Sequence, residues 1–486
     1  MSPAQQRRLP EPGTVSVLLF AAVHALWSTR SHWNIHRGLG TSAYDVGLYD
    51  QGVWLLSRFK SPFVTLMGRN MLGDHASLIL FLVVPLYWVV PGTETLLALQ
   101  SALIAAGALP VYFCARRLLS SQSAALVFAV AWLVNPAVNG ANFENFHPDS
   151  FLALLVPLAL WALLTRRFRW YTVSVVLSAL VKEDVSLVLV PLGLLAVVRG
   201  EGRRGILTIV GAVAASLAGM FLLMRNLIGV PTRNGWRIPF GGVKGFLRET
   251  VTNPSNVLRY LGSEGRLFYL WQMTAPFAFV FMLAPEVAAV SALVIVGNVV
   301  STFWYQFHIG YHYSLVAVPA LVFATVVGVS RIHRDTRPVA VSIVLLASVV
   351  SGVMWTALPF GLQRFDGWTA DSAVAREGRA IIAQVPRGVP VSVFHALAPH
   401  LAHREEIYQF PNPFRTVLYG NDEKKEGTRN PAADRIQYVV IPLSLDPQGT
   451  ADFLAIVPEF EPWRKNGSWA IWKRRASPTV APSGAP

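Results

Sequence analysis

The chain has 486 residues, of which 53% are hydrophobic and 14% are charged, whereas ordinary soluble domains carry about 25% charged residues. Residues 1–357 hold 40 of the 68 charges, whereas residues 358–486 hold 28, the density of a soluble domain. A single soluble globule is therefore excluded, and the apolar content also excludes a disordered chain. We expect a multi-pass transmembrane domain over 1–357, a soluble α/β domain over 358–476 and a disordered tail over 477–486.

The net charge of +14 lies almost entirely in the apolar part of the chain, where residues 1–357 contribute +12. In a soluble protein such an excess would indicate nucleic acid. Here the basic residues flank apolar runs, which is typical of membrane proteins that face anionic lipid. We therefore expect membrane lipid as a partner and no nucleic acid.

Because a helix needs about 20 mostly apolar residues to cross a bilayer, the apolar runs predict the transmembrane helices. Several of the runs are short for a full span. In chain order the eleven runs are 14–29, 95–115, 123–138, 150–165, 170–181, 185–198, 205–225, 268–284, 286–302, 314–330 and 338–357.

A twelfth apolar run covers residues 76–90 in a long first outer loop, residues 30–94. If this run crossed the membrane, the basic clusters Arg116-Arg117 and Arg166–Arg169 would face outward, against the tendency of short basic loops to stay in the cytoplasm. We therefore predict that residues 76–90 form a re-entrant or interfacial helix. The N-terminus is then cytoplasmic and residues 358–486 are extracytoplasmic.

The soluble part alternates between helical and strand patterns. Residues 371–384 have helical periodicity, whereas 390–394, 435–441 and 468–473 have the apolar runs or alternation of strands. The last of these follows a turn at Asn466-Gly467.

Ionisable residues near membrane depth are costly and mark functional sites. The first outer loop contains Asp45, Asp50, Asp74 and His75, which we take as candidate catalytic residues. A carboxylate there can remove a proton from an acceptor hydroxyl. For Asp74 the alternative is a helix cap on the run that follows it.

A second outer loop of about eleven residues must lie close to the membrane surface, and it contains Glu144, His147 and Asp149. Asp149 or Ser150 could equally cap the helix that begins there. Glu144 and His147 have no such structural explanation, so all three ionisable residues are candidates for substrate binding.

Three consecutive charges, Lys182, Glu183 and Asp184, follow the short run 170–181. Twelve residues of helix span about 18 Å, too little to cross the bilayer core, so the charges should lie at or inside the outer leaflet. One interpretation is a self-neutralising ion pair that stabilises the bundle. The other is that Lys182 binds an anionic lipid headgroup, with Glu183 and Asp184 beside it.

A fourth outer segment, residues 305–314, is rich in aromatic residues and contains His308 and His312. If the segment is helical, the two histidines share one face, a spacing that suits a metal ion, although no third ligand is in register. An aromatic belt at the membrane surface is the alternative. A divalent metal therefore remains possible as a cofactor, and the sequence requires none.

Several motifs resemble a large bacterial family of polytopic membrane proteins of unknown function, which is grouped with the C-class (GT-C fold) integral-membrane glycosyltransferases. The resemblance covers nearly the whole chain. Its motifs are residues 44–51 with Trp54, Gly73-Asp-His75, 108–112 with 115–117, Phe146-His-Pro-Asp149, 182–186, Tyr311-His-Tyr313, and 399–404 with 407–408 and 410–411.

The resemblance implies a GT-C-like bundle in the bacterial plasma membrane, with a sugar on polyprenyl phosphate as donor and a glycan, lipid or protein as acceptor. It also implies a catalytic acidic residue in the first outer loop, at the position of Asp45. Related families carry a His-Pro-Pro-type motif where this chain has Gly73-Asp-His75 followed by Ala76-Ser77, so that correspondence is loose.

Three functions are compatible with the sequence. The first is a glycosyltransferase in which Asp45 is the general base and Lys182 binds the donor phosphate with the help of His312 or His147. The second is a transporter or lipid flippase, although internal repeats typical of many transporters are not evident. The third is a non-catalytic scaffold of the cell envelope.

Overall fold

The computed structural model describes residues 11–228, 234–364, 367–417 and 425–476. The predicted disordered tail, 477–486, lies outside the described residues. The chain divides into two compact units. One comprises residues 1–32, 72–83 and 94–365, and the other comprises 33–71, 84–93 and 366–486. The second unit thus combines most of the predicted first outer loop with the soluble part of the chain.

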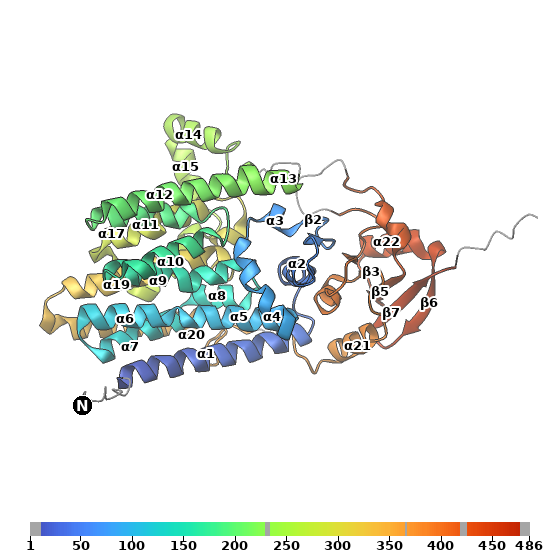
Figure 1. Cartoon of the computed structure of the whole chain (residues 1–486), viewed down its shortest axis with the longest axis horizontal. Helices are drawn as coiled ribbons and strands as arrows, with labels where there is room; N and C mark the ends of the chain where they lie inside the picture. Colours follow the sequence, from blue (N-terminus) through green and yellow to red (C-terminus); the bar gives the residue numbers. More distant parts are fainter. Residues whose placement is uncertain (1–10, 229–233, 365–366, 418–424, 477–486) are drawn as a thin grey trace, which may run out of the picture. The chain divides into compact units, whose positions relative to one another are not determined.

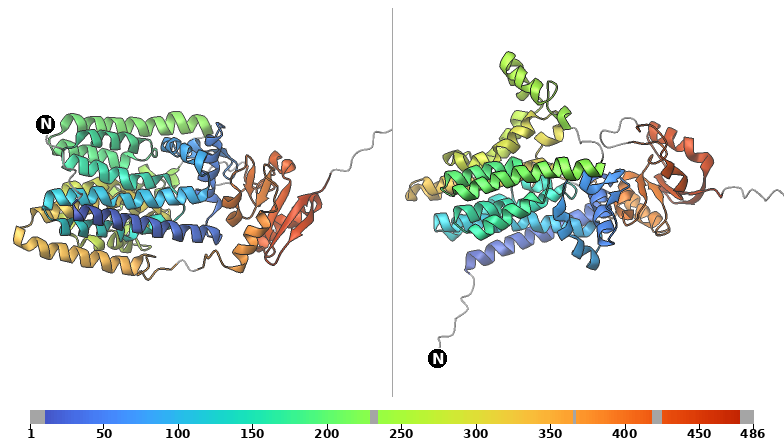
Figure 2. Two further views of the ribbon diagram at one scale, coloured as in Figure 1. Left: turned by 60° about the horizontal axis from the view of Figure 1, so that its bottom comes forward. Right: turned by 45° about the horizontal axis from the view of Figure 1, so that its top comes forward.

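The first unit is a bundle of helices, several of which lie side by side in Figures 1 and 2. Its helices begin within α1 (Pro12–Arg37) and continue with α5 (Thr93–Ala106), α6 (Ala108–Leu119), α7 (Gln122–Leu133), α8 (Pro136–Phe143), α9 (Leu152–Leu164), α10 (Phe168–Ala179), α11 (Ser186–Val198), α12 (Gly202–Leu217), α13 (Arg225–Ile228), α14 (Val243–Thr252), α15 (Pro254–Leu261), α16 (Arg266–Thr274), α17 (Pro285–Ala288), α18 (Ala292–Val300), α19 (Val318–Arg331) and α20 (Arg337–Trp355).

Helix α19 is part of the core of this bundle, because every residue from Val318 to Val329 is buried. A helix that is apolar all round belongs in such a position. Outer helices instead expose large apolar side chains, including Leu207 and Val210 on α12 and Leu346 on α20, each about 60% exposed. Apolar side chains at an outer surface fit contact with hydrocarbon rather than with water.

Five helical segments among the described residues are long and apolar enough to cross a membrane, and a bent pair, Gln122–Leu133 with Pro136–Phe143, could add a sixth. The five segments are Pro12–Arg37, Thr93–Leu119, Gly202–Leu227, His312–Arg331 and Arg334–Trp355. Shorter apolar helices occupy Pro148–Leu164, Ser186–Val198 and Pro285–Val300. The chain is therefore a multi-pass membrane protein, and the count of eleven spans remains a prediction.

The run 76–90 does not form one long helix. It contains a 3-10 turn, η2 (Leu78–Leu82), followed by the six-residue helix α4 (Val84–Val89). Six helical residues rise about 9 Å, far less than a bilayer core. The run is thus short and broken, as expected for a segment that does not cross the membrane.

The second unit contains a five-stranded sheet in the order β4-β3-β5-β7-β6 within the described residues. Its strands are β3 (Val391–Val393), β4 (Ile407–Gln409), β5 (Tyr438–Pro442), β6 (Phe460–Lys465) and β7 (Trp469–Arg474). Strand β3 pairs in parallel with β4 and β5, whereas β7 runs antiparallel to both β5 and β6. Helices α21 (Ala373–Ile382) and α22 (Pro447–Ile456) complete the α/β fold, which Figure 2 shows from two sides.

The predicted strands and helix of the soluble part are confirmed by β3, β5, β7 and α21. The Asn466 side chain closes the β6–β7 turn, because its Oδ1 atom accepts hydrogen bonds from the backbone N–H groups of Ser468 and Trp469. Strands β4 and β6 and helix α22 were not expected. Strand β4 has only three residues, and strand β6 contains a proline and three charged residues, so neither shows a clear apolar alternation.

The first-outer-loop part of the second unit holds α2 (Leu48–Ser57) and a short hairpin of β1 (Phe63–Val64) and β2 (Arg69–Asn70). The four-residue α3 (Met71–Asp74) crosses the boundary between the units. Thr65 hydrogen-bonds both the carbonyl and the N–H of Ile407, at 2.6 and 3.0 Å. This loop segment therefore packs against the edge strand β4 of the sheet.

Candidate functional site

The predicted second outer loop is a sharp turn between α8 and α9, set by its capping residue and a proline. Asn135 caps α8, since its side chain accepts hydrogen bonds from the N–H groups of Ala137 and Val138. The helix ends before Glu144, and His147 is extended (φ −134°, ψ 143°) because it precedes Pro148. The 3-10 turn η3 (Pro148–Phe151) and then α9 follow, so Glu144 and His147 both lie in the turn that connects α8 to α9.

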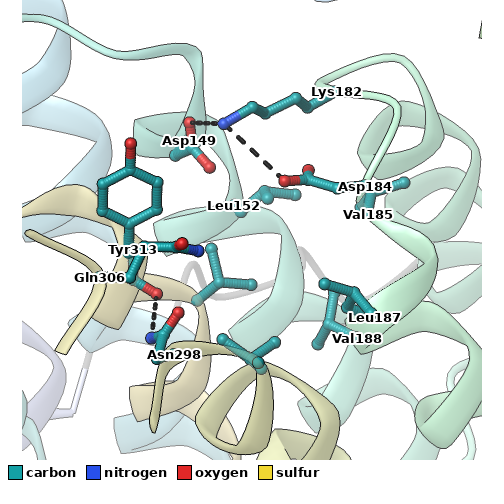
Figure 3. Close-up of a pocket in the computed structure, with 13 residues that line it drawn as sticks. Asp149, Leu152, Lys182, Asp184, Val185, Leu187, Val188, Asn298, Gln306 and Tyr313 are labelled. Carbon is teal, nitrogen blue, oxygen red and sulfur yellow. Dashed lines mark hydrogen bonds and ion pairs between the residues drawn. The ribbon is translucent and has the colours of Figure 1, made fainter. Parts of the chain in front are cut away.

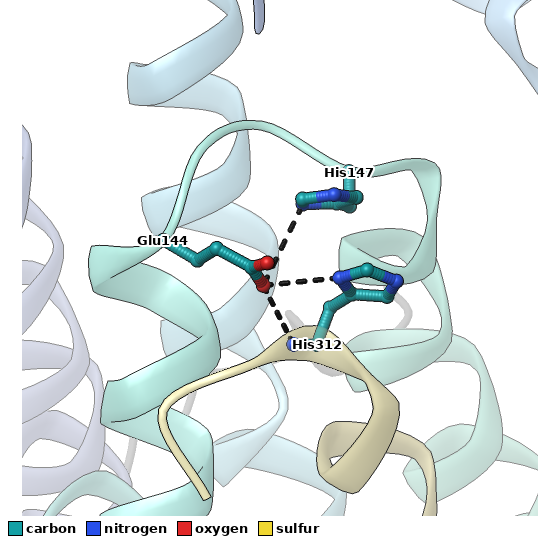
Figure 4. A group of neighbouring side chains, drawn as sticks. All are labelled: Glu144, His147 and His312. Atoms are coloured by element: carbon teal, nitrogen blue, oxygen red, sulfur yellow. Dashed lines mark hydrogen bonds and ion pairs between the residues drawn. The ribbon is translucent and has the colours of Figure 1, made fainter. Parts of the chain in front are cut away.

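Glu144, His147 and His312 form a compact cluster, although His312 lies 168 residues from Glu144 in the sequence (Figure 4). The Glu144 Oε2 atom accepts hydrogen bonds from the backbone N–H of His312 at 2.6 Å and lies 3.0 Å from its Nδ1. The two imidazole rings stack with centroids 3.7 Å apart. All three side chains are at most 10% exposed, so the cluster is buried.

The Gln100 side chain on α5 holds this turn in place. Its Nε2 atom donates to the carbonyls of Asn142 and Asn145, at 3.1 and 3.3 Å, and its Oε1 accepts from the N–H of His147 at 3.0 Å. Gln100 is 1% exposed. Gln100 was not among the predicted site residues, because an uncharged residue in an apolar run gives no charge signal. The available signal was a glutamine within the predicted span 95–115.

Lys182 lies in the loop between α10 and α11, at the edge of a pocket of about 70 Å³ (Figure 3). Its Nζ atom is 3.6 Å from Oδ2 of Asp149 and 3.9 Å from Oδ2 of Asp184. The other walls are mainly apolar, and Asn298, Gln306 and Tyr313 add polar atoms. The apolar lining residues are Leu152, Val185, Leu187, Val188, Val294 and Val316.

Neighbouring carboxylates favour the protonated form of Lys182, although the side chain is buried. Burial lowers its pKa, but the carboxylates of Asp149, Asp184 and Glu183 outweigh this effect and raise the pKa well above its usual value. The two ion-pair distances exceed the 2.7–2.9 Å or so of a direct charge-assisted hydrogen bond. The buried ammonium, whose pKa is raised, therefore keeps N–H groups that can contact an anion at this partly apolar pocket.

Neither Asp149 nor Ser150 caps the following helix. Asp149 is the second residue of the 3-10 turn η3 (Pro148–Phe151), whose N-cap position is His147. The Asp149 Oδ2 and Ser150 Oγ atoms are both buried without a hydrogen-bond partner. The Asp149 carboxylate instead faces Lys182, which favours the site interpretation over the capping interpretation.

His75 and Glu183, the residue after Lys182 in the sequence, form a second, partly buried ion pair. The His75 Nδ1 atom is 2.8 Å from Glu183 Oε1, and the N–H of Ala76 donates to Glu183 Oε2 at 3.1 Å. Burial and the nearby Lys182 charge lower the pKa of His75, but the charge and hydrogen bond of Glu183, together with Asp74, outweigh them, so the net shift is upward. The backbone N–H of Ile79 also bonds the carbonyl of Leu180, which aligns the two segments.

Asp74 ends α3 and its carboxylate lies 3.9 Å from the His75 ring. The following 3-10 turn has Ser77, not Asp74, at its N-cap position. Asp74 is thus not in place to cap that turn.

Asp45, in the second unit, has a strained backbone. It lies in a single π-turn, η1 (Ala43–Gly47), with φ 62° and ψ −99°. A non-glycine residue in such a sparsely populated region costs about 1–3 kcal/mol and is concentrated at functional sites. The side chain is half-buried.

Asp50 has a different environment from Asp45. It is 2% exposed and accepts hydrogen bonds from Tyr87 Oη at 2.7 Å and Thr93 Oγ1 at 2.9 Å, with His403 Nε2 at 3.0 Å. These partners come from two other segments of the second unit, residues 84–93 and 366–486. The carboxylate therefore connects these segments, a structural role that the sequence alone did not indicate.

Residues 305–314 do not form one helix, so the condition under which His308 and His312 would share a helix face is not met. His308 and Tyr311 are extended (φ −133° and −119°), and they separate η9 (Trp304–Phe307) from η10 (His312–Ala317). His308 is exposed and packs edge-on against Trp304 and Tyr311. His308 thus lies among aromatic side chains, whereas His312 joins the buried cluster.

Two further polar residues of the pocket were missed, Asn298 on α18 and Gln306. Asn298 is 4% exposed and donates from Nδ2 to the carbonyl of Tyr313 at 3.0 Å and to Tyr269 Oη at 2.9 Å. An asparagine within the apolar run 286–302 was the available signal.

Comparison with solved structures identifies the fold. The crystal structure of ArnT from Cupriavidus metallidurans bound to undecaprenyl phosphate matches with a TM-score of 0.57 and 13% identity, over 96% of this chain and 99% of that one. The apo-state structure of the same protein matches with a TM-score of 0.58 and 14% identity, over 95% and 98%. The expected GT-C fold is thereby confirmed, and at this identity the likeness concerns the fold alone.

No curated protein sequence matches the chain. The family model described as "Predicted membrane protein (DUF2079)" matches residues 35–469, which include the strained Asp45, the cluster of Glu144, His147 and His312, and the Lys182 pocket. The chain therefore belongs to the DUF2079 family of predicted membrane proteins.

Proposed function

We propose that the protein is a glycosyltransferase that moves a sugar from a polyprenyl-phosphate donor to an acceptor hydroxyl at the outer face of the plasma membrane. The observation that carries the proposal is the pocket that combines the buried ammonium of Lys182 with a mainly aliphatic wall. A lipid phosphate presents the matching pair of groups, an anion next to an apolar chain. The solved ArnT structure with undecaprenyl phosphate, which has the same fold, supports this class of ligand.

Lys182 would bind the donor phosphate and stabilise the charge that develops on it as the sugar leaves. The ammonium is already charged because Asp149 and Asp184 lie beside it, so no proton has to be taken up when the phosphate binds. Asp149 and Asp184 would then act as positioning residues for the Lys182 side chain.

Asp45 would act as the general base that removes the proton from the acceptor hydroxyl. Its strained, half-buried position in the first outer loop supports this assignment. Asp50 is a weaker candidate, since three hydrogen-bond partners already occupy its carboxylate. Asp74 and His75 remain further candidates. The proposed orientation has a cytoplasmic N-terminus, and residues 358–486 outside.

The test compares Asp45→Asn with Lys182→Ala in the full-length protein reconstituted in lipid. Asp45→Asn should abolish sugar transfer and keep the affinity for undecaprenyl phosphate, because the base acts on the acceptor. Lys182→Ala should weaken undecaprenyl-phosphate binding at least tenfold, since the charged contact is lost. Transfer is measured from a radiolabelled polyprenyl-phosphate sugar into membrane glycans or lipids.

Matched controls are Asp335→Asn and Lys60→Ala, whose side chains are 89% and 46% exposed and lie outside both sites. Both controls should retain transfer and binding. Near-full transfer by Asp45→Asn would refute the general-base role. Wild-type affinity in Lys182→Ala would refute the phosphate site. Lipid binding without transfer by the wild type would favour a lipid flippase instead.

A further inference from the structure

The cluster of Glu144, His147 and His312 has no role in the transfer reaction proposed above, yet it combines three metal-ligating side chains in one buried place (Figure 4). We propose that these three residues bind one divalent transition-metal ion, with Zn²⁺ as the ion that the donor set fits. Two imidazoles and one carboxylate are a common zinc ligand set, whereas Mg²⁺ and Ca²⁺ prefer oxygen ligands alone.

The distances fit an ion of this size. One ligand atom from each residue lies within 4.8 Å of the others. Glu144 Oε2 is 3.0 Å from His312 Nδ1 and 3.8 Å from His147 Nδ1. Zinc bonds of about 2.0–2.2 Å in tetrahedral geometry separate neighbouring ligand atoms by about 3.4 Å. Because the two rings are stacked with centroids 3.7 Å apart, each ring would have to rotate to direct a nitrogen lone pair at one shared ion, and His147 would then present its Nε2 atom.

The framework around the cluster is rigid without an ion. Gln100 fixes the turn that carries Glu144 and His147 through hydrogen bonds to Asn145 and His147. On the other side, α8 approaches the segment before His312 so closely that a Cβ atom at Gly140 would lie 2.1 Å from the carbonyl oxygen of Ile309. Only glycine allows this approach, which brings the two ligand-bearing segments together.

His147 also has the partner that orients a coordinating imidazole. Its Nδ1 atom lies 2.9 Å from the carbonyl of Asn145. Coordination through Nε2 would keep this hydrogen bond, and ligating histidines commonly donate their second ring N–H to a carbonyl in this way. Coordination through Nδ1 would break it.

The described residues supply three ligands, which leaves a fourth position for water or another oxygen, as in open zinc sites. The neighbours of the ligands in the chain, Asp149 and Tyr313, line the Lys182 pocket. An ion would therefore fix two walls of that pocket. This consequence rests on the proposed function, whereas the metal site itself does not.

The test measures zinc binding to the full-length protein, purified with a histidine-free tag, stripped with a chelator and titrated with Zn²⁺ in the absence of any donor lipid. Wild type should retain about one equivalent of zinc by mass spectrometry after desalting, and its melting temperature should rise. Glu144→Gln and His312→Asn should each lower zinc affinity at least a hundredfold. The exposed His308→Ala is the matched control and should bind like wild type.

A Co²⁺ titration of the wild type gives a second readout that needs no variant, because a tetrahedral site with nitrogen and oxygen ligands produces characteristic visible absorption. Sub-stoichiometric zinc in the wild type would overturn the proposal. So would a cooperatively melting Glu144→Gln/His312→Asn double variant with wild-type affinity. Neither result depends on sugar transfer, so the failure of the metal site and the failure of the proposed function can be told apart.

Discussion

The Nζ atom of Lys182 lies 3.6 Å from Oδ2 of Asp149, and less than a tenth of either side chain is exposed. A buried ion pair of this kind adds little net stability, because desolvation of both charges offsets their attraction. Removal of one partner is different, since it leaves the other charge buried and uncompensated. A single substitution of Lys182 or Asp149 should therefore destabilise the protein. The intact pair is available for a binding function.

Lys182→Met should destabilise the protein by about 3–5 kcal/mol, because Asp149 then loses its nearest cation. The double variant Lys182→Met/Asp149→Leu should recover most of this loss, yet should still fail to bind undecaprenyl phosphate. Thermal unfolding in detergent, followed by tryptophan fluorescence, measures the first effect. Lys60→Met, which breaks the exposed pair with Glu405, should cost at most about 1 kcal/mol. Equal melting of Lys182→Met and wild type would contradict the prediction.

The His75–Glu183 pair should make stability depend on pH. The pKa of folded His75 is raised above its usual value of 6.5, so protonated His75 contributes stability that is complete below about pH 6.5 and is lost as the pH rises through the raised pKa. Glu183 stays ionised throughout this range, because, although burial raises its pKa, His75 lowers it to about 2.

The difference in melting temperature between wild type and His75→Gln should therefore be largest near pH 5.5–6 and should shrink in more alkaline buffer. A series of melts from about pH 5.5 to pH 9 measures it. His333→Gln, at a side chain that is 78% exposed, should show no such dependence. A difference that grows with pH would show that the neutral form of His75 is the one stabilised.

Asp50→Asn should destabilise the second unit, because the amide has one acceptor oxygen where the carboxylate serves Tyr87, Thr93 and His403. A hydrogen bond to a charged group contributes about 1.5–3 kcal/mol, and at least one such bond is lost. Tyr87→Phe should give a smaller loss. Thermal melts and protease sensitivity measure both. Asp335→Asn should stay within about 0.5 kcal/mol of wild type, as surface substitutions usually do.

Thr65→Val should loosen the edge strand β4. The threonine hydroxyl bonds both the carbonyl and the N–H of Ile407, and valine has no group to replace it. Hydrogen exchange at β4 should accelerate about tenfold if roughly 1.4 kcal/mol of local stability is lost. Peptides from the central strands β5 and β7 should be unaffected. The exposed Thr250→Val is the control variant. Unchanged exchange at β4 would mean that the two segments are held together by other contacts.

The sequence by itself determined the class of the protein. Apolar runs of this length and a low charge density predict a helical membrane bundle, because a helix satisfies its own backbone hydrogen bonds, as water-free hydrocarbon requires. Alternating patterns at 390–394 and 468–473 likewise predicted strands β3 and β7, since side chains in a strand alternate between two faces. The motifs from Asp45 to Tyr313 indicated the GT-C-related family.

Only the tertiary structure decided which charged residues meet. Asp50 and Asp45 lie five residues apart in one loop, but Asp50 is enclosed by Tyr87, Thr93 and His403, which come from distant segments. His312 and His308 are separated by extended backbone, so their spacing of four carries no shared face. Lys182 pairs with Asp149, and His312 with Glu144, across long stretches of chain. Such pairings depend on how the helices pack against one another. A local sequence pattern indicates which face of a helix or strand is buried, but it does not indicate which other element packs against that face.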